Sequence, residues 1–216
     1  MHEVPHSSFE AVVFDFGGVL ITSISNQIGA IASSHGVETA TMLEVIMGPR
    51  DSGPGHPWHR AERGEIAVSA IQELLDPWAG ERGVMLRGDE IERVLAPGGY
   101  SVVGAMIDRI GRLRSDGYRT GLLTNTFAEF QPTMQRDIDF GLFDVVVESF
   151  AVGSRKPERT IYEMAQAQLG VDHGAIVYLD DFEQNLAEPI ALGWTTIQVG
   201  DPTDALTQLD RVLSVR

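Results

Sequence analysis

Short runs of apolar residues, each followed by a segment with helical spacing, recur along most of this chain. The runs are continuous rather than alternating, which is typical of strands that are buried on both faces of a sheet. The predicted strands are residues 11–16, 118–124, 144–148, 175–180 and 195–199. The segments after them carry apolar residues three or four positions apart, which predicts amphipathic helices. These predicted helices are residues 102–113, 127–138, 158–169 and 183–192.

Strands that alternate with helices predict an α/β fold, a doubly wound, Rossmann-like parallel sheet with helices on both faces. In such sheets, ligands bind beyond the carboxyl ends of the strands. Asp15, Thr124 and the adjacent Asp180 and Asp181 all fall at those ends. We therefore expect these side chains to lie together at one edge of the sheet.

Residues 22–97 do not share this rhythm and predict a helical insertion after the first strand. Apolar helical patches occur in this region, and a Gly/Pro-rich stretch at residues 48–57 interrupts them. The patches are residues 28–32, 40–47, 66–75 and 90–95. Residues 96–99, Ala-Pro-Gly-Gly, predict a hinge at the second boundary. We divide the chain into an α/β core domain, residues 1–21 and 98–216, and a helical cap domain, residues 22–97, of a kind that excludes water as a lid.

The composition is that of an ordinary soluble globular protein, with 43% hydrophobic and 22% charged residues in 216. A net charge of -15 argues against nucleic acid and against an anionic membrane surface as partners. A small phosphorylated substrate stays compatible with that charge, because a bound cation reverses the field locally. The chain has no cysteine, which excludes disulfides, thiolate zinc sites and cysteine nucleophiles.

The beginning of the chain is polar, and the apolar run that follows is broken by Asp15. We therefore expect neither a signal peptide nor a membrane span. The expected protein is cytoplasmic and is a monomer or a homodimer.

The first strand and its turn carry the clearest chemical signal, Val-Val-Phe-Asp-Phe-Gly-Gly-Val-Leu, centred on Asp15. A buried strand that delivers one carboxylate to a glycine-rich bend places it beside exposed backbone amides, which predicts a nucleophile or a metal ligand. Asp180 and Asp181 point the same way, because adjacent carboxylates repel each other without a cation.

Taken together, the ends of these elements resemble the motifs of the haloacid dehalogenase superfamily. The matching residues are Asp15, Thr124, Lys156, Asp180 and Asp181, in the contexts of the first strand, Leu-Leu-Thr-Asn-Thr, Ser-Arg-Lys-Pro-Glu and Tyr-Leu-Asp-Asp-Phe-Glu-Gln-Asn. Two groups of that superfamily look most similar: the phosphatase-like N-terminal domain of soluble epoxide hydrolases, and bacterial sugar-phosphate phosphatases typified by glucose-1-phosphate phosphatase. The cap segment Trp-His-Arg-Ala-Glu-Arg-Gly-Glu-Ile, residues 58–66, carries part of this resemblance.

The resemblance implies a Mg²⁺-dependent phosphatase that acts on a small phosphorylated metabolite. Asp15 would attack phosphorus and form an aspartyl-phosphate that water later hydrolyses. Mg²⁺ would sit on Asp15, the Gly17 carbonyl and Asp181, with Asp180 acting through water or by orienting Lys156.

The remaining implied roles concern charge balance and substrate binding. Lys156 would keep Asp15 ionised and balance charge on the transferring phosphoryl group. Thr124, Asn125 and backbone N–H groups after Asp15, including that of Gly18, would bind the phosphoryl oxygens. From the cap, His59 and Arg63 are candidates for contact with the substrate, and Trp58 either packs within the cap or lines the mouth of the pocket.

Gly17 departs from the resemblance, because most phosphatases of the superfamily carry an acid–base Asp at that position. General acid–base help contributes roughly 10²–10⁴ in rate. Three alternatives follow: a leaving group that needs little protonation, such as an acyl or anomeric phosphate; a cap histidine, His59 or His56, as the acid; or a binding protein that does not turn over. A metal-independent haloacid dehalogenase is a further alternative, since halide needs no acid, but it leaves Asp180 and Asp181 without a cation.

Overall fold

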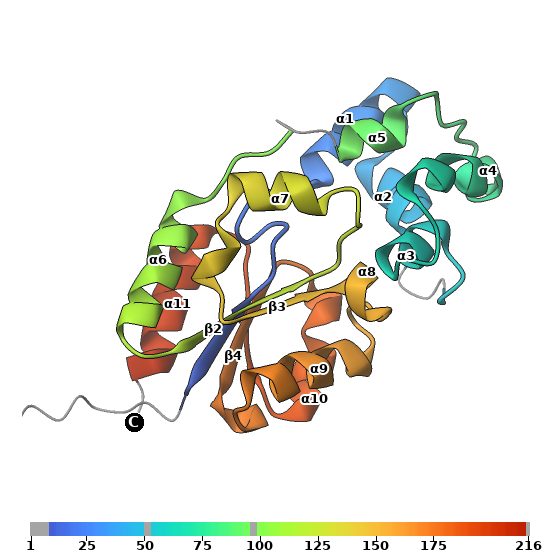
Figure 1. Cartoon of the computed structure of the whole chain (residues 1–216). Helices are drawn as coiled ribbons and strands as arrows, with labels where there is room; N and C mark the ends of the chain where they lie inside the picture. The colour runs from blue at the N-terminus through green and yellow to red at the C-terminus, as the bar shows by residue number, and fades with distance from the viewer. Residues whose placement is uncertain (1–8, 50–52, 96–98, 215–216) are drawn as a thin grey trace, which may run out of the picture.

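A parallel five-stranded sheet lies at the centre of the protein (Figure 1). The computed structural model describes residues 9–49, 53–95 and 99–214. The strands are β1 (Ala11–Phe14), β2 (Arg119–Thr124), β3 (Val145–Glu148), β4 (Ile176–Asp180) and β5 (Thr195–Gln198). Their order in the sheet is β3-β2-β1-β4-β5, which places the first strand in the middle. The predicted doubly wound α/β fold is confirmed.

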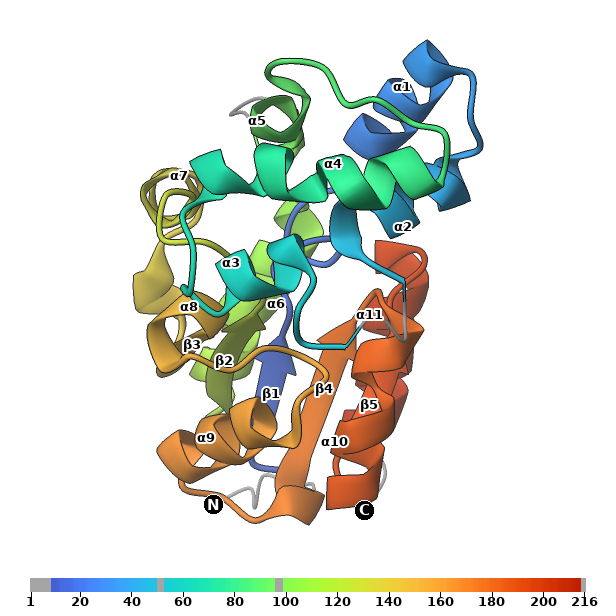
Figure 2. The same cartoon turned by 90° about the vertical axis from the view of Figure 1, so that its right-hand side faces the viewer.

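Helices cover both faces of the sheet because successive strand side chains point to opposite sides. Val12 and Phe14 belong to one hydrophobic cluster, whereas Ala11 and Val13 belong to another. The first face packs against α6 (Gly104–Ser115), α7 (Gln131–Asp137) and α11 (Pro202–Ser214). The second packs against α9 (Arg159–Leu169) and α10 (Ala187–Leu192), and Figure 2 shows both of these layers. Short connecting helices complete the core: α8 (Ser149–Val152), η2 (Phe140–Leu142), η3 (His173–Ala175) and η4 (Glu183–Asn185).

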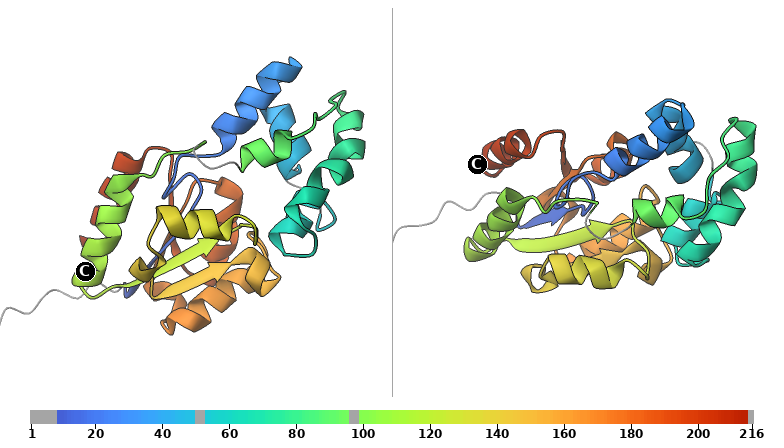
Figure 3. Two further views of the ribbon diagram at one scale, coloured as in Figure 1. Left: turned by 45° about the horizontal axis from the view of Figure 1, so that its top comes forward. Right: turned by 90° about the horizontal axis from the view of Figure 1, so that it is seen from above.

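A second group of helices, here called the cap helices, lies within the residues predicted as an insertion. They are α1 (Ser25–His35), α2 (Thr39–Met47), α3 (Pro57–Glu62), α4 (Ile71–Glu81) and α5 (Glu90–Val94), with the short η1 (Val68–Ala70) before α4. They share a hydrophobic cluster of their own, to which the core contributes Phe127. Figure 3 shows them beside the sheet rather than on either face. Most of the predicted hinge, residues 96–98, lies outside the described residues.

The structure differs from the predicted helices mainly at their ends. The helix predicted at 127–138 begins only at Gln131, with Pro132 in its first turn, where a missing N–H costs nothing. Helix α3 begins at Pro57, the last residue of the Gly/Pro-rich stretch, and the ring of His56 accepts a hydrogen bond from Trp58 N at 3.3 Å. Helix α11 was not predicted, although the spacing of Ala205 and Leu209 indicates it. No helix in the described ranges is both long and apolar enough to cross a membrane.

Candidate active site

The predicted reactive residues meet at the carboxyl end of the sheet. Phe14 in β1 pairs with Leu122 in β2 and Leu179 in β4, so the residues that follow these positions lie at the same level. One cavity, with a volume of about 90 Å³, opens at this edge. Its lining includes six of the predicted site residues: Asp15, Gly17, Thr124, Asn125, Lys156 and Asp181.

Lys156 is the centre of the polar contacts. Its Nζ lies 2.7 Å from Oδ1 of Asp15 and 2.7 Å from Oδ2 of Asp180, and it donates to the hydroxyl of Tyr178 at 3.1 Å. The residue is 1% exposed. Burial alone would lower the pKa of Lys156, but the charges of Asp15 and Asp180 outweigh it and raise that pKa above its usual value. The site therefore holds a buried ammonium group between two carboxylates.

Asp180 is fully engaged by donors from its surroundings. Its Oδ1 accepts from Phe182 N at 2.8 Å, and both of its oxygens lie 3.1 Å from Nδ2 of Asn185. The hydroxyl of Tyr178 donates to Oδ2. These contacts fix the carboxylate that holds Lys156. Of the two roles predicted for Asp180, the orientation of Lys156 is the one for which the structure shows a direct contact.

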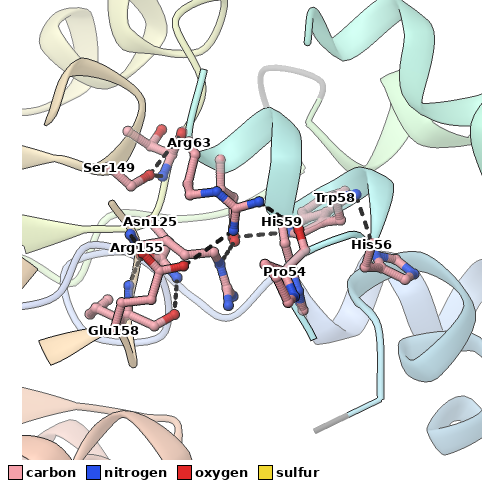
Figure 4. A network of polar contacts seen from close by, with 12 residues as sticks. Pro54, His56, Trp58, His59, Arg63, Asn125, Ser149, Arg155 and Glu158 are labelled. Carbon is pink, nitrogen blue, oxygen red and sulfur yellow. Dashed lines mark hydrogen bonds and ion pairs between the residues drawn. The ribbon is translucent and has the colours of Figure 1, made fainter. Parts of the chain in front are cut away.

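Asn125 contacts the backbone of Lys156 on both sides. Its Oδ1 accepts from Lys156 N at 2.8 Å, and its Nδ2 donates to Lys156 O at 3.0 Å, as Figure 4 shows around Asn125. The Asn125 amide therefore positions Lys156 in this structure, and its contact with a phosphoryl group stays a prediction. Among the described residues, the Thr124 hydroxyl makes only a long hydrogen bond, to Asn125 O at 3.4 Å, so this hydroxyl remains available on the cavity wall.

Three carboxylates form a group of the size that a metal ion needs. Oxygens of Asp15, Asp180 and Asp181 lie within 4.8 Å of one another. Among the described residues, Oδ1 of Asp181 is buried and has no hydrogen-bond partner. Burial, followed by the charges of Asp15 and Asp180, raises the pKa of Asp181 to about 8. Burial also raises the pKa of Asp15 to about 7, against the opposing charge of Lys156. All these features fit a hard divalent cation, which oxygen ligands prefer to bind.

Two glycines follow Asp15, and the structure requires glycine at only one of these positions. Gly18 has φ +70°, and a Cβ there would lie 2.0 Å from Oδ2 of Asp181, so no side chain fits. Gly18 is not among the residues that line the cavity, and the contact of its backbone N–H with a phosphoryl oxygen stays a prediction. Gly17 does line the cavity, and a Cβ there would meet no heavy atom within 4 Å. Packing thus requires glycine at position 18 but not at 17.

A buried ion pair joins the cap helices to the core at the cavity wall, and the sequence did not indicate it. Oε2 of Glu62, on α3, accepts from Nε of Arg155, the residue before Lys156. Its Oε1 accepts from Nε1 of Trp58 at 2.9 Å. All three residues line the cavity. The spacing of Trp58 and Glu62, one helical turn apart, was the available signal.

His59 and Arg63, predicted to contact the substrate, lie on the neighbouring face of α3. In the described structure neither lines the cavity. The ring of His59 is bonded to Gly53 O at 3.1 Å, and Arg63 contacts Glu65 at 2.6 Å, Glu158 at 3.2 Å and Pro54 O (Figure 4). Because one helix position rotates a side chain by about 100°, Trp58 and Glu62 occupy the wall instead.

The other cap histidine, His56, is also remote from the cavity lining. Its ring is fully buried and packs edge-on against Trp78, with centroids 4.8 Å apart. Burial, and then the neighbouring His59, lowers the pKa of His56 to about 4. Burial also lowers the pKa of His59, with Arg155 adding to it. In this arrangement neither histidine is placed to give a proton to a ligand.

Comparison with protein families gives a match over most of the chain. A model described as a hydrolase, "haloacid dehalogenase-like hydrolase", matches residues 9–187. The chain is 30% identical over 217 residues to mouse acyl-CoA dehydrogenase family member 10 and 32% identical over 227 residues to rat bifunctional epoxide hydrolase 2. Each match covers 95% of this chain, which spans only 19% and 39% of those proteins. A sesquiterpene phosphatase of Aspergillus oryzae is 25% identical and is matched over 96% of this chain and 98% of its own length.

Solved structures show the same fold. A predicted haloacid dehalogenase-like hydrolase of Porphyromonas gingivalis has a TM-score of 0.71 at 22% identity, covering 97% of this chain and 100% of its own. A haloacid dehalogenase family enzyme of Bacteroides thetaiotaomicron, in complex with magnesium and inorganic phosphate, has a TM-score of 0.63 at 18% identity. That match covers 89% of this chain and 96% of the other.

Proposed function

This chain belongs to the haloacid dehalogenase-like hydrolase family, and we propose that it is a Mg²⁺-dependent phosphatase that works through an aspartyl-phosphate at Asp15. One observation carries the proposal: a buried Asp15 paired with Lys156 beside Asp181, whose Oδ1 has no partner in the described structure. The sesquiterpene phosphatase among the relatives, and the related fold that holds magnesium and inorganic phosphate, support phosphoryl chemistry.

The nucleophile is Asp15, held in place by Lys156. The Nζ contact at 2.7 Å favours the ionised carboxylate and opposes burial, which favours the neutral form. The ionised oxygen bonds to phosphorus as the bond to the leaving oxygen breaks. Water then attacks the aspartyl-phosphate and restores the carboxylate. Lys156 compensates negative charge in both steps from a position that Asp180 and Asn125 fix.

The residues that would hold the cation are Asp15, Asp181 and the carbonyl of Gly17. When bound, Mg²⁺ supplies positive charge that offsets the repulsion between the Asp15 carboxylate and the phosphate. The unpartnered Oδ1 of Asp181 is the observation in favour of such a ligand. A dehalogenase reaction without metal would leave this oxygen without a partner, and the single charge of Lys156 would have to offset three clustered carboxylates.

The test is the hydrolysis of 4-nitrophenyl phosphate with and without Mg²⁺. We expect turnover only with the metal, its loss in Asp15→Asn, and normal rates in Asp116→Asn, which changes an exposed carboxylate at the end of α6. Trapping with acid should leave phosphate bound to the wild-type protein and none to Asp15→Asn. Release of halide from a 2-haloacid without metal, or binding of phosphate esters without any turnover, would contradict the proposal.

A further inference from the structure

We propose that the substrate carries its phosphate on a weakly basic oxygen of an apolar acyl or aryl group, so that the leaving group departs without protonation. This inference rests on the proposed phosphatase function and narrows it. Two observations carry it: among the described residues, no side chain that lines the cavity is placed to donate a proton to the leaving oxygen, and the lining includes five aromatic side chains.

Each titratable side chain that lines the cavity in the described structure already has another partner or another proposed role. They are Asp15, Glu62, Arg155, Lys156 and Asp181. Lys156 is held between two carboxylates, and Asp15 is the proposed nucleophile. Asp181 belongs to the acidic group that fits a cation. None of these groups is free to act as a general acid on the far side of the phosphate.

Glu62 is the carboxyl group on the cap side, and it is also engaged. Both of its oxygens accept hydrogen bonds, one from Trp58 Nε1 and one from Arg155 Nε. Both oxygens of Glu62 act as acceptors in these contacts, so this carboxyl group is not positioned to donate a hydrogen bond to a ligand. Arg155 is held by its contact with Glu62.

Gly17 leaves open the place where an acid would stand. It lines the cavity, and a Cβ added there would meet no heavy atom within 4 Å. The histidines of the cap do not supply a substitute, because neither His56 nor His59 lines the cavity in the described structure. In the part of the chain that the structure describes, no fixed acid is therefore placed at the leaving oxygen.

The nature of the organic group follows from the aromatic wall. It is formed by Phe16, Trp58, Phe127, Phe130 and Phe182. Trp58 and Phe127 meet edge to face with their centroids 5.0 Å apart, across the boundary between cap and core. Such a wall favours a flat or apolar group and offers few partners to the hydroxyl groups of a sugar. Among weakly basic leaving groups, acyl and aryl phosphates therefore fit better than an anomeric sugar phosphate.

The chemical steps balance without an acid. Asp15 forms a bond to phosphorus, and the leaving oxygen departs with the electron pair of the broken P–O bond, as a carboxylate or phenolate. Water then bonds to phosphorus, the P–O bond to Asp15 breaks, and the proton of water passes to the released phosphate or to solvent. Because no general base assists this second step, the aspartyl-phosphate is expected to accumulate with good leaving groups. A burst of released phenolate would report it.

The experiment compares phosphate esters of 4-nitrophenol, phenol and 2-phenylethanol, which increase in basicity at the leaving oxygen but share an aromatic body. For wild type with Mg²⁺ we expect kcat/KM to fall by about 10²–10⁴-fold toward the alkyl ester, the usual contribution of a general acid. Gly17→Asp should restore part of the alkyl activity. Gly17→Asn, which has the same size but no acidic proton, should not.

The possible outcomes distinguish failure of this inference from failure of the proposed phosphatase function. Equal kcat/KM for the aryl and alkyl esters, or equal rescue by Gly17→Asn, would overturn the inference and leave the phosphatase standing. Preference for glucose 1-phosphate over phenyl phosphate would overturn the inference that the organic group of the substrate is apolar. If no ester is hydrolysed and no phosphate is trapped on wild type, the proposed function itself fails.

Discussion

Removal of the Glu62 carboxylate is expected to weaken the closure of the cap helices on the core. Glu62 on α3 pairs with Arg155, which precedes Lys156 in the core, and both side chains are nearly buried, at 5% and 10% exposed. Glu62→Ala leaves a guanidinium without its counter-charge and the indole N–H of Trp58 without its acceptor. Both unpaired groups then face a cavity that is largely apolar.

The expected cost follows from these two losses. Breaking a buried ion pair by removing one partner costs about 3–5 kcal/mol. A buried donor left without an acceptor adds about 1–3 kcal/mol. Because water that enters the cavity can reach both groups after the truncation, we expect a total near the lower end of the sum, about 4 kcal/mol. The matched control is Glu65→Ala, which breaks the contact of Arg63 with a side chain that is 44% exposed and should cost about 0.2–1 kcal/mol.

The assay is urea unfolding of both variants, combined with a double-mutant cycle of Glu62→Ala and Arg155→Met. We expect a coupling energy of more than about 1 kcal/mol, because the two side chains share one buried contact. If Glu62→Ala costs no more than Glu65→Ala and the coupling is near zero, the pair does not form in solution. The cap helices would then not be joined to the core by this contact at the cavity wall.

Three further predictions concern the acidic group, the turn and the buried histidine. Above pH 8, where Asp181 with its pKa of about 8 is ionised, Asp181→Asn should raise the melting temperature without metal, because it removes a buried unpartnered charge, and it should abolish the rise that Mg²⁺ gives wild type in thermal unfolding. Gly18→Ala should lose activity and stability through its clash with Asp181, whereas Gly17→Ala should fold as wild type by the same measurement. The free energy of unfolding should fall, by up to about 3 kcal/mol, as pH drops from 6.5 toward 4. The reason is that His56 has a pKa of about 4 in the folded chain, so between pH 6.5 and 4 it binds a proton mainly in the unfolded chain. His56→Gln should therefore make the free energy of unfolding less dependent on pH in this range.

The meeting of Asp15, Thr124 and Asp180 at one edge could be predicted from the sequence because a parallel sheet imposes it. Each of these residues ends or follows a continuous apolar run, and parallel strands end at the same side. The position of Lys156 could be predicted only by resemblance, since it lies in a loop between α8 and α9. Its placement depends on Asn125, whose bonds to the Lys156 backbone join segments that are distant in sequence.

The choice of residues on α3 could not be made from the sequence. The pairs Trp58–Glu62 and His59–Arg63 are each one turn apart, and each contains an aromatic ring and a charge. A helix of 6 residues is too short for its apolar pattern to decide which pair faces the core. That decision depends on Arg155, which offers a buried partner to Glu62, and on Phe127, against which Trp58 packs.

The contact of Tyr178 with the charged centre could be predicted from its position in β4. It precedes Asp180 by two positions in β4, so both side chains point to the same face of the sheet. Read as an apolar strand residue, it adds only to the core. In the structure its ring packs among Tyr162 and Trp194, while its hydroxyl contacts both Lys156 and Asp180. The residue thus links the hydrophobic cluster to the charged centre.

The glycine at position 17 matters for the chemistry of the site, because packing does not force the absence of an acidic side chain there. Gly18 must be glycine, as its positive φ and the approach of Asp181 require. At Gly17 the space for a side chain is open on the cavity side, so an aspartate would be accommodated by the same fold. A site that has room for an acid and lacks one gains nothing in stability from the omission. We therefore expect the difference to act on the reaction itself, and to be tolerated by the substrates proposed above, whose leaving oxygen needs no proton.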